Sequence, residues 1–126
     1  MFRIFPRRRA ALRLLAALLL APALAVAAEF VPGFEDLPLM PGLAVVPNAG
    51  VVFDKPDGRI VETVAAGPVG PAELASFYRS TLPQLGWSLL TETPRRIVFR
   101  REGEVLNIDH AESSAGLTVR FFLAPR

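Results

Sequence analysis

The fold is decided by the stretch RIVFRREGEVLNID, residues 96–109, which contains two strands and the turn that joins them. If Glu102-Gly103 is a two-residue hairpin turn, Phe99 lies opposite Leu106 and Ile97 lies opposite Ile108. Side chains alternate between the two faces of a sheet, so these four apolar residues share one face. The other face then pairs Arg100 with Val105, Val98 with Asn107, and Arg96 with Asp109. Because the apolar partners align without adjustment, this is the register that the sequence predicts.

The same register extends to the strand that follows. An even-length loop across residues 111–116 places a last strand beside the second one and keeps the alternation of faces. Its buried side chains are expected to be Leu117, Val119, Phe121 and Leu123, and its open-face side chains Thr118, Arg120 and Phe122. The strand before the hairpin begins near Trp87. The turn at Thr93-Pro94 is either even or odd in length, so the face that Trp87 occupies stays open.

A helix is expected upstream of these strands. Residues 67–70 (GPVG) break the chain, and Pro71 suits the first position of a helix. One apolar helical face follows at Leu74, Phe77, Tyr78, Leu82 and Leu85. Gly86 is a natural terminator. Before the helix, residues 51–66 form a hairpin, because β-branched runs flank the turn sequence KPDG at residues 55–58.

These elements predict an α+β domain over residues 51–126, with the order ββαββββ and an antiparallel sheet. A single helix packs on one face of such a sheet and leaves the other uncovered. That open face is half apolar, so we expect something to cover part of it. The candidate within the chain is the segment 29–50, an extended arm that contains four prolines.

The arm carries more apolar side chains than a solvated linker would. They are Phe30, Val31, Phe34, Leu37, Leu39, Met40, Leu43, Val45 and Val46. Two interpretations follow: the arm packs on its own domain, or it docks on a partner. The first is favoured over the second.

Residues 1–28 have the pattern of a cleaved signal peptide. Five arginines precede the uncharged run LLAALLLAPALAVAA at residues 14–28, and Ala25-Val26-Ala27 fits a signal peptidase site. The run is shorter than the about 20 apolar residues of a spanning helix, so a retained membrane anchor is the less favoured alternative. We therefore expect a periplasmic or secreted protein, with no stable membrane span after cleavage.

The composition of the chain argues against nucleic-acid binding and against cysteine-based sites. The 98 residues after the signal hold nine Lys and Arg against twelve Asp and Glu, a net charge of −3. Nucleic-acid binding needs a surplus of cations, so it is not expected. The chain has no cysteine, which excludes a disulfide framework and zinc–thiolate sites.

Catalytic groups are scarce in this sequence. His110 is the one histidine, and its neighbour Asp109 points to the opposite face of a strand, so the two are poorly placed to form a dyad. Glu102 and Glu104 are expected to pair with Arg101 rather than to act as an acid–base couple. We predict no catalytic residue, metal site or cofactor. A small hydrolase or anion-dependent enzyme that uses His110 and nearby carboxylates is the alternative.

The candidate binding cluster consists of Arg96, Arg100, Arg120 and Phe122 on the open face. Guanidinium groups suit an anion such as a carboxylate, a phosphate or a lipid headgroup. The competing interpretation is structural and is favoured. In it Arg96 pairs with Asp109 across strands, Arg100 stacks on an aromatic ring and Arg120 is solvated.

Two motifs carry a family resemblance. The pattern FY-x3-LP-x-LGW at residues 77–87, followed by F-x-REGE-x-L-x-I at residues 99–108, resembles small exported bacterial domains of uncharacterised function. In those domains the helix leads into an antiparallel sheet. The layout is also similar to helix-on-sheet modules of envelope lipoproteins that assist outer-membrane assembly. The resemblance covers about residues 48–125 and implies a fold, but no catalytic residue.

The sequence therefore predicts a non-catalytic binding or accessory module of the bacterial envelope. Its partner is expected to be an envelope protein or peptide, accepted as an extended segment by an edge strand or by the half-apolar face. The oligomeric state is left open, because an exposed edge strand permits dimerisation without requiring it. A membrane-tethered structural protein is the further possibility if the anchor is retained.

Overall fold

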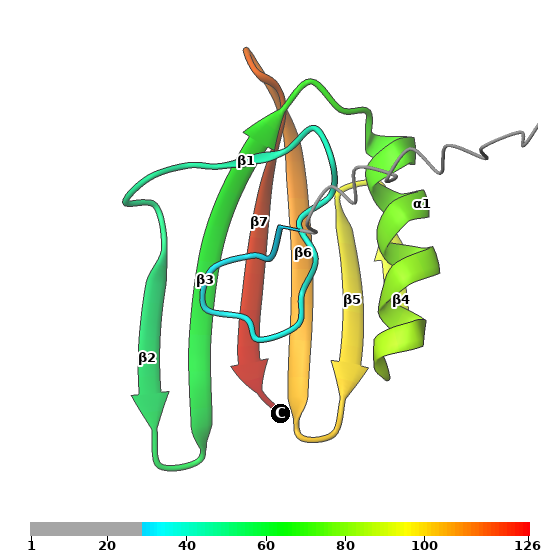
Figure 1. The fold of residues 1–126 in the computed structure, drawn as a ribbon. Helices are drawn as coiled ribbons and strands as arrows, with labels where there is room; N and C mark the ends of the chain where they lie inside the picture. The colour runs from blue at the N-terminus through cyan, green and yellow to red at the C-terminus, as the bar shows by residue number, and fades with distance from the viewer. Residues whose placement is uncertain (1–28) are drawn as a thin grey trace, which may run out of the picture.

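The Glu102-Gly103 turn joins strands β5 (Arg96–Arg101) and β6 (Glu104–Ser113) in the predicted register, with Phe99 opposite Leu106 and Ile97 opposite Ile108. The structure is a computed structural model that describes residues 29–126, and the predicted signal peptide lies outside them. Within that range one α-helix accompanies a seven-stranded antiparallel sheet, so the chain is α+β (Figure 1).

The remaining elements follow in chain order. They are β1 (Ala44–Val45), β2 (Val51–Lys55), β3 (Gly58–Gly67), α1 (Pro71–Thr81), a 3-10 helix (Leu82–Leu85), β4 (Ser88–Thr93) and, after β5 and β6, β7 (Gly116–Pro125). The strand order in the sheet is β1-β3-β7-β6-β5-β4, and β2 also pairs with β3. Since β7 occupies one side of β3, both β1 and β2 lie along its other side.

Strand β1 is missing from the predicted order ββαββββ. Ala44 and Val45 pair with Ala66 and Ala65 on the part of β3 that extends beyond β2. Two residues between prolines carry no strand pattern of their own. They become a strand because the open edge of β3 offers them hydrogen bonds, which is tertiary information that the sequence does not display.

The predicted loop at residues 111–116 is shorter than expected. Strand β6 continues to Ser113, which pairs with Gly116, so the turn is Ser114-Ala115. The loop nevertheless keeps an even length, and the faces of β7 are those predicted. Leu117, Val119, Phe121 and Leu123 are buried, whereas Thr118, Arg120 and Phe122 are half-buried on the open face.

The arm lies on the inner face of the sheet, not on the open face where the sequence analysis placed it. Val31, Phe34, Leu37, Leu39, Met40 and Leu43 are buried in the same cluster as Leu74 and Tyr78 of α1. Figure 1 shows the arm in cyan crossing in front of β3, β7 and β6, beside the helix. Six adjacent strands span about 25 Å, whereas a helix with its side chains is only about 10 Å wide. The inner face therefore has room for both, and its apolar side chains require both.

Tyr78 joins the helix, the arm and the sheet. Its hydroxyl donates a hydrogen bond to the carbonyl oxygen of Pro38 at 2.9 Å and accepts one from the backbone N–H of Met40 at 3.1 Å. Its ring lies edge-on to Phe121 of β7, with the ring centroids 5.5 Å apart. Burial raises the pKa of the Tyr78 hydroxyl well above its ordinary value, so the group stays protonated and can donate.

Trp87 lies on the inner face of the sheet. Its side chain is buried, and the guanidinium carbon of Arg101 lies 4.3 Å from the ring centroid. Arg101 follows Ile97 and Phe99 at spacing two and belongs to the inner face. Strand β4, which begins directly after Trp87, has a register shift between Leu89 and Thr91, and such an irregularity made the face of Trp87 hard to assign from sequence.

Across residues 29–126, no helix is both long enough and apolar enough to cross a membrane.

We predict that Tyr78→Phe lowers the free energy of unfolding by about 1–3 kcal/mol, because a buried N–H and a buried C=O each lose their partner while the ring still fills its site. Urea unfolding measures the change, and the amide of Met40 should exchange its hydrogen faster. Ser76→Ala, on the exposed side of α1, is the control. Equal stability of Tyr78→Phe and wild type would show that the hydroxyl does not hold the arm.

Candidate functional site

A row of ion pairs crosses the open face of the sheet. Arg120 of β7 contacts Glu62 of β3 through two hydrogen bonds of 2.6 and 3.2 Å, and it also reaches Asp109 of β6 at 3.4 Å. On the other side of Asp109, Arg96 of β5 donates at 2.5 and 3.1 Å. Hydrogen bonds from Arg120 hold the pKa of Glu62 below its ordinary value, and Asp109 raises the pKa of Arg96. The two arginines and the two carboxylates of the row therefore balance each other in charge.

Two of the four residues of the predicted binding cluster, Arg96 and Arg120, belong to this row. Arg96 and Arg120 are already paired with carboxylates, and the guanidinium carbon of Arg120 lies 4.6 Å from the centre of the Phe122 ring. Arg100 lies four residues along β5 from Arg96, which is about 13 Å in a strand. It sits opposite Val105 and forms no ion pair among the described residues. The structure thus brings Arg96, Arg120 and Phe122 together and leaves Arg100 apart.

Beyond the ion pairs, the open face becomes apolar toward the β2–β3 turn. Phe53 pairs with Ile60, and Val105 pairs with Ala124 in a neighbouring part of the sheet. This part of the face is continuous with β2, whose five residues are all exposed. Val52 and Phe53 each leave 60% of their surface accessible. We refer to Val51–Lys55 and their outward main-chain groups as the β2 edge.

Arg101 does not pair with Glu102 or Glu104 as predicted. It donates two hydrogen bonds to Asp36 of the arm, at 2.6 and 3.1 Å, and one to the carbonyl oxygen of Leu85 at 3.0 Å. Glu104 instead contacts Arg59, at 3.4 Å. Hydrogen bonding from Arg101 lowers the pKa of Asp36. The reason for the difference is that the arm lies on the inner face beside Arg101. Asp36 is far from Arg101 in the sequence, but its carboxylate lies within hydrogen-bond distance in the fold.

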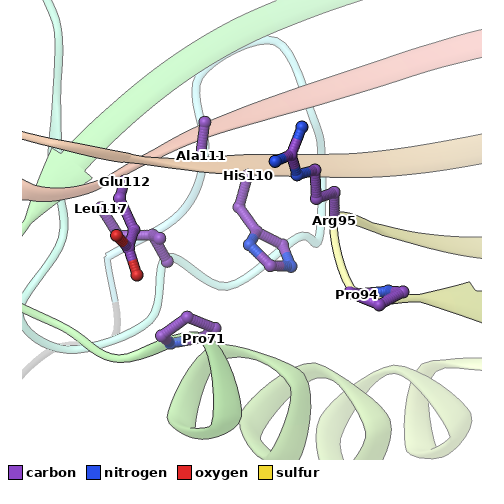
Figure 2. Close-up of a pocket in the computed structure, with 7 residues that line it drawn as sticks. All are labelled: Pro71, Pro94, Arg95, His110, Ala111, Glu112 and Leu117. Atoms are coloured by element: carbon purple, nitrogen blue, oxygen red, sulfur yellow. The ribbon is translucent and has the colours of Figure 1, made fainter.

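His110 opens into a cavity of about 460 Å³ at the end of the inner face. The cavity is lined by Pro71, Pro94, Arg95, His110, Ala111, Glu112 and Leu117. Figure 2 shows the imidazole directed toward Pro71 at the start of α1, with Glu112 on one side and Arg95 on the other, and with the Arg95 guanidinium turned away from Pro71. Only 8% of the surface of His110 is exposed. Burial lowers its pKa, although the charge of Asp109 opposes the shift, so the ring is neutral near pH 7.

The surroundings of the His110 imidazole differ from those of the histidine in a Ser-His-Asp triad. Asp109 belongs to the ion-pair row on the opposite face of β6, as the strand alternation predicts, so it does not orient the imidazole. No Ser, Thr or Tyr is among the cavity's seven lining residues. Among residues 29–126, no three His, Asp or Glu side chains gather closely enough to hold a metal ion.

Arg95 and Glu112 were not singled out from the sequence. The signal was present, because Glu112 follows Leu106, Ile108 and His110 at spacing two and so belongs to the inner face. Arg95 lies beside His110, because the backbone N–H of His110 donates a hydrogen bond to the backbone carbonyl oxygen of Arg95 at 3.0 Å. The inner-face position of Glu112 was not predicted because residues 111–116 were assigned to a loop. The position of Arg95 was not predicted because the length of the turn at Pro94 was uncertain.

The comparisons with known proteins add no relative to this description. No protein family, curated protein or solved structure matches the chain.

We predict that His110 makes the protein less stable as the pH falls through about 6.5. The folded-state pKa lies below the ordinary value of 6.5, so in the window between the two the unfolded chain binds a proton that the folded chain does not. The free energy of unfolding therefore falls as the pH falls through this window. Asp109, Arg95 and Glu112 are the charged groups near the ring.

The measurement is urea unfolding from about pH 7.5 to pH 5, on wild type and His110→Gln. The variant should lose this part of the slope, whatever its absolute stability. The contributions of Glu62 and Asp36 are lost only at lower pH, since their pKa values lie below 4.5 and 3.8. Identical slopes for the two proteins would contradict the assignment.

Proposed function

We propose that the protein is a non-catalytic binding module of the bacterial envelope, and that its β2 edge accepts an extended segment of a partner protein. The observation that supports this proposal is the combination of a free sheet edge with three adjacent exposed apolar residues, Val51, Val52 and Phe53. Native proteins usually blunt such edges with charges, prolines or covering segments. A partner strand that adds to the edge satisfies both its main-chain groups and its apolar side chains.

The main-chain groups available to a partner follow from the register. Lys55 and Gly58 flank a two-residue turn and form a hydrogen-bonded pair, so hydrogen-bonded and non-bonded pairs alternate from there along the ladder. Val52 and Asp54 occupy the non-bonded positions. Their N–H and C=O groups therefore point away from β3, toward the free edge.

The chemistry of the edge sets the character of the segment. Val51 and Phe53 lie on the open face, next to Glu62 and Ile60 of β3, and Val52 lies on the side of the arm. A segment with apolar residues at alternate positions would extend the apolar part of the open face. Pro47 and Pro56 bracket β2, so only a short stretch of a few residues is free to pair.

The test is selection of short peptides from a random displayed library on the purified protein. We expect enriched peptides with alternating apolar residues and micromolar affinity. Asp54→Pro should abolish their binding, because it removes an outward N–H without removing a β2–β3 hydrogen bond. Phe53→Lys should weaken binding by about ten-fold or more, as expected for loss of a buried aromatic anchor.

Leu90→Lys is the matched control, because Leu90 is also exposed but lies on β4 at the opposite side of the sheet. Peptides that bind wild type and Asp54→Pro equally well would refute the use of the β2 edge. Peptides whose binding depends on Leu90 would place the site on β4 instead.

Export is the second part of the proposal. It is supported by the arginine-rich start, the uncharged run and the small-residue motif within residues 1–28. We predict that the protein isolated from a bacterial envelope fraction begins at Ala28 or Glu29. Intact mass measures the N-terminus directly. A full-length mass with membrane retention would instead favour the tethered structural protein.

A further inference from the structure

Three polar side chains gather where the inner face of the sheet ceases to be apolar. His110 and Glu112 follow Leu106 and Ile108 along the same face of β6, and Arg95 lies beside His110 in the turn just before β5. None of the three forms an ion pair or a side-chain hydrogen bond within residues 29–126. In the same range, five other arginines are ion-paired: Arg59, Arg79, Arg96, Arg101 and Arg120.

The imidazole of His110 is the informative member of this group. It is more than nine-tenths buried, yet no described residue bonds either ring nitrogen. These nitrogens are not among the fully buried unpaired atoms, so their remaining contact with solvent is through the cavity that the residue lines. Buried polar groups are nearly always satisfied. A donor and an acceptor that face a cavity therefore need a partner there, either water or a polar group of a bound molecule.

We infer that this cavity binds a free α-amino acid with an apolar side chain. In the bound state the exposed side chain of Arg95 turns toward the imidazole and holds the carboxylate. Glu112 holds the ammonium group, and His110 hydrogen-bonds to the carboxylate between them. Pro71, Pro94 and Leu117 form the apolar wall that contacts the ligand's side chain (Figure 2).

Charge balance favours a zwitterion over a simple anion or cation. Arg95 and Glu112 contribute one charge of each sign, and the desolvated imidazole is neutral, so the lining carries no net charge. An anion alone would meet Glu112, and a cation alone would meet Arg95. Helix α1 begins at Pro71 without a side-chain cap, and the positive end of its dipole adds to the attraction for a carboxylate.

The size of the cavity agrees with a small ligand. Its volume of about 460 Å³ lies within the range of about 300–1,000 Å³ that is typical of small-molecule sites. Four of its seven lining residues are proline, alanine or leucine and the other three are polar, so the lining offers both apolar contacts and polar contacts that can orient a ligand. This site is separate from the β2 edge and does not depend on the function proposed for that edge.

The experiment is an NMR titration of the purified protein with leucine, with 4-methylpentanoate, which lacks the amine, and with 3-methylbutylamine, which lacks the carboxylate. We expect saturable shifts of the Arg95, His110 and Glu112 amides with leucine. Each analogue should bind at least about ten-fold more weakly, because it leaves one charged side chain unpaired. A fourth arm, the dipeptide Leu-Leu, distinguishes a free amino acid from a peptide end and should also bind more weakly.

Two variants assign the charges. Arg95→Gln should weaken leucine and 4-methylpentanoate but leave the amine unaffected, and Glu112→Gln should weaken leucine and the amine but not the acid. Both residues are exposed, so their replacement should leave thermal unfolding unchanged. Arg100→Gln and Glu102→Gln are the matched controls and should bind leucine as wild type does.

Three results would overturn the inference. The first is the absence of saturable shifts with leucine, and the second is equal binding of leucine and 4-methylpentanoate, which would indicate a simple anion site. Tighter binding of Leu-Leu than of leucine is the third, because it would assign the cavity to a peptide terminus.

Discussion

The structure depends on the inner face of its sheet being wider than the one helix that packs there. The 11-residue α1 places Leu74 and Tyr78 in the core, and the arm adds six further buried side chains. The two are joined through the Tyr78 hydroxyl, which satisfies one donor and one acceptor of the arm while its ring contacts β7. Arg101 makes a second connection, because it reaches Asp36 of the arm and Leu85 after the helix. The arm is therefore part of the fold rather than an appendage.

This division of the inner face determines what remains for function. The arm is committed to the core, so within residues 29–126 the open face and the β2 edge have no covering segment. The charges of the ion-pair row from Glu62 to Arg96 balance each other in the middle of the open face. The uncovered apolar side chains of that face lie beside β2. At the opposite end, β6 and β7 extend beyond the start of the helix, and there the face becomes polar around His110. The two proposed sites lie in these two regions.

Local patterns in the sequence predicted the sheet well and its covering poorly. Glu102-Gly103 sets the β5–β6 register, and alternation then assigns nearly every side chain of β5, β6 and β7 to the correct face. Proline and glycine likewise set the limits of α1. The arm carries no period, because its prolines exclude both helix and regular strand, so its apolar side chains did not reveal which face they cover. The partners of Arg101 and Arg59 depend on that placement and could not be predicted without it. The pairing of Arg96 with Asp109 followed from the register, whereas the placement of Arg95 and Glu112 beside His110 required correct strand ends.

The most direct test of this account compares the cooperative unfolding of residues 29–126 with that of residues 48–126, by urea titration with tryptophan fluorescence and hydrogen exchange. If the arm completes the core, the longer chain unfolds in one transition, and the shorter one loses cooperative unfolding and amide protection in β3, β6 and β7. Equal stability and equal protection of both chains would contradict the account, because the helix alone would then suffice to cover the inner face.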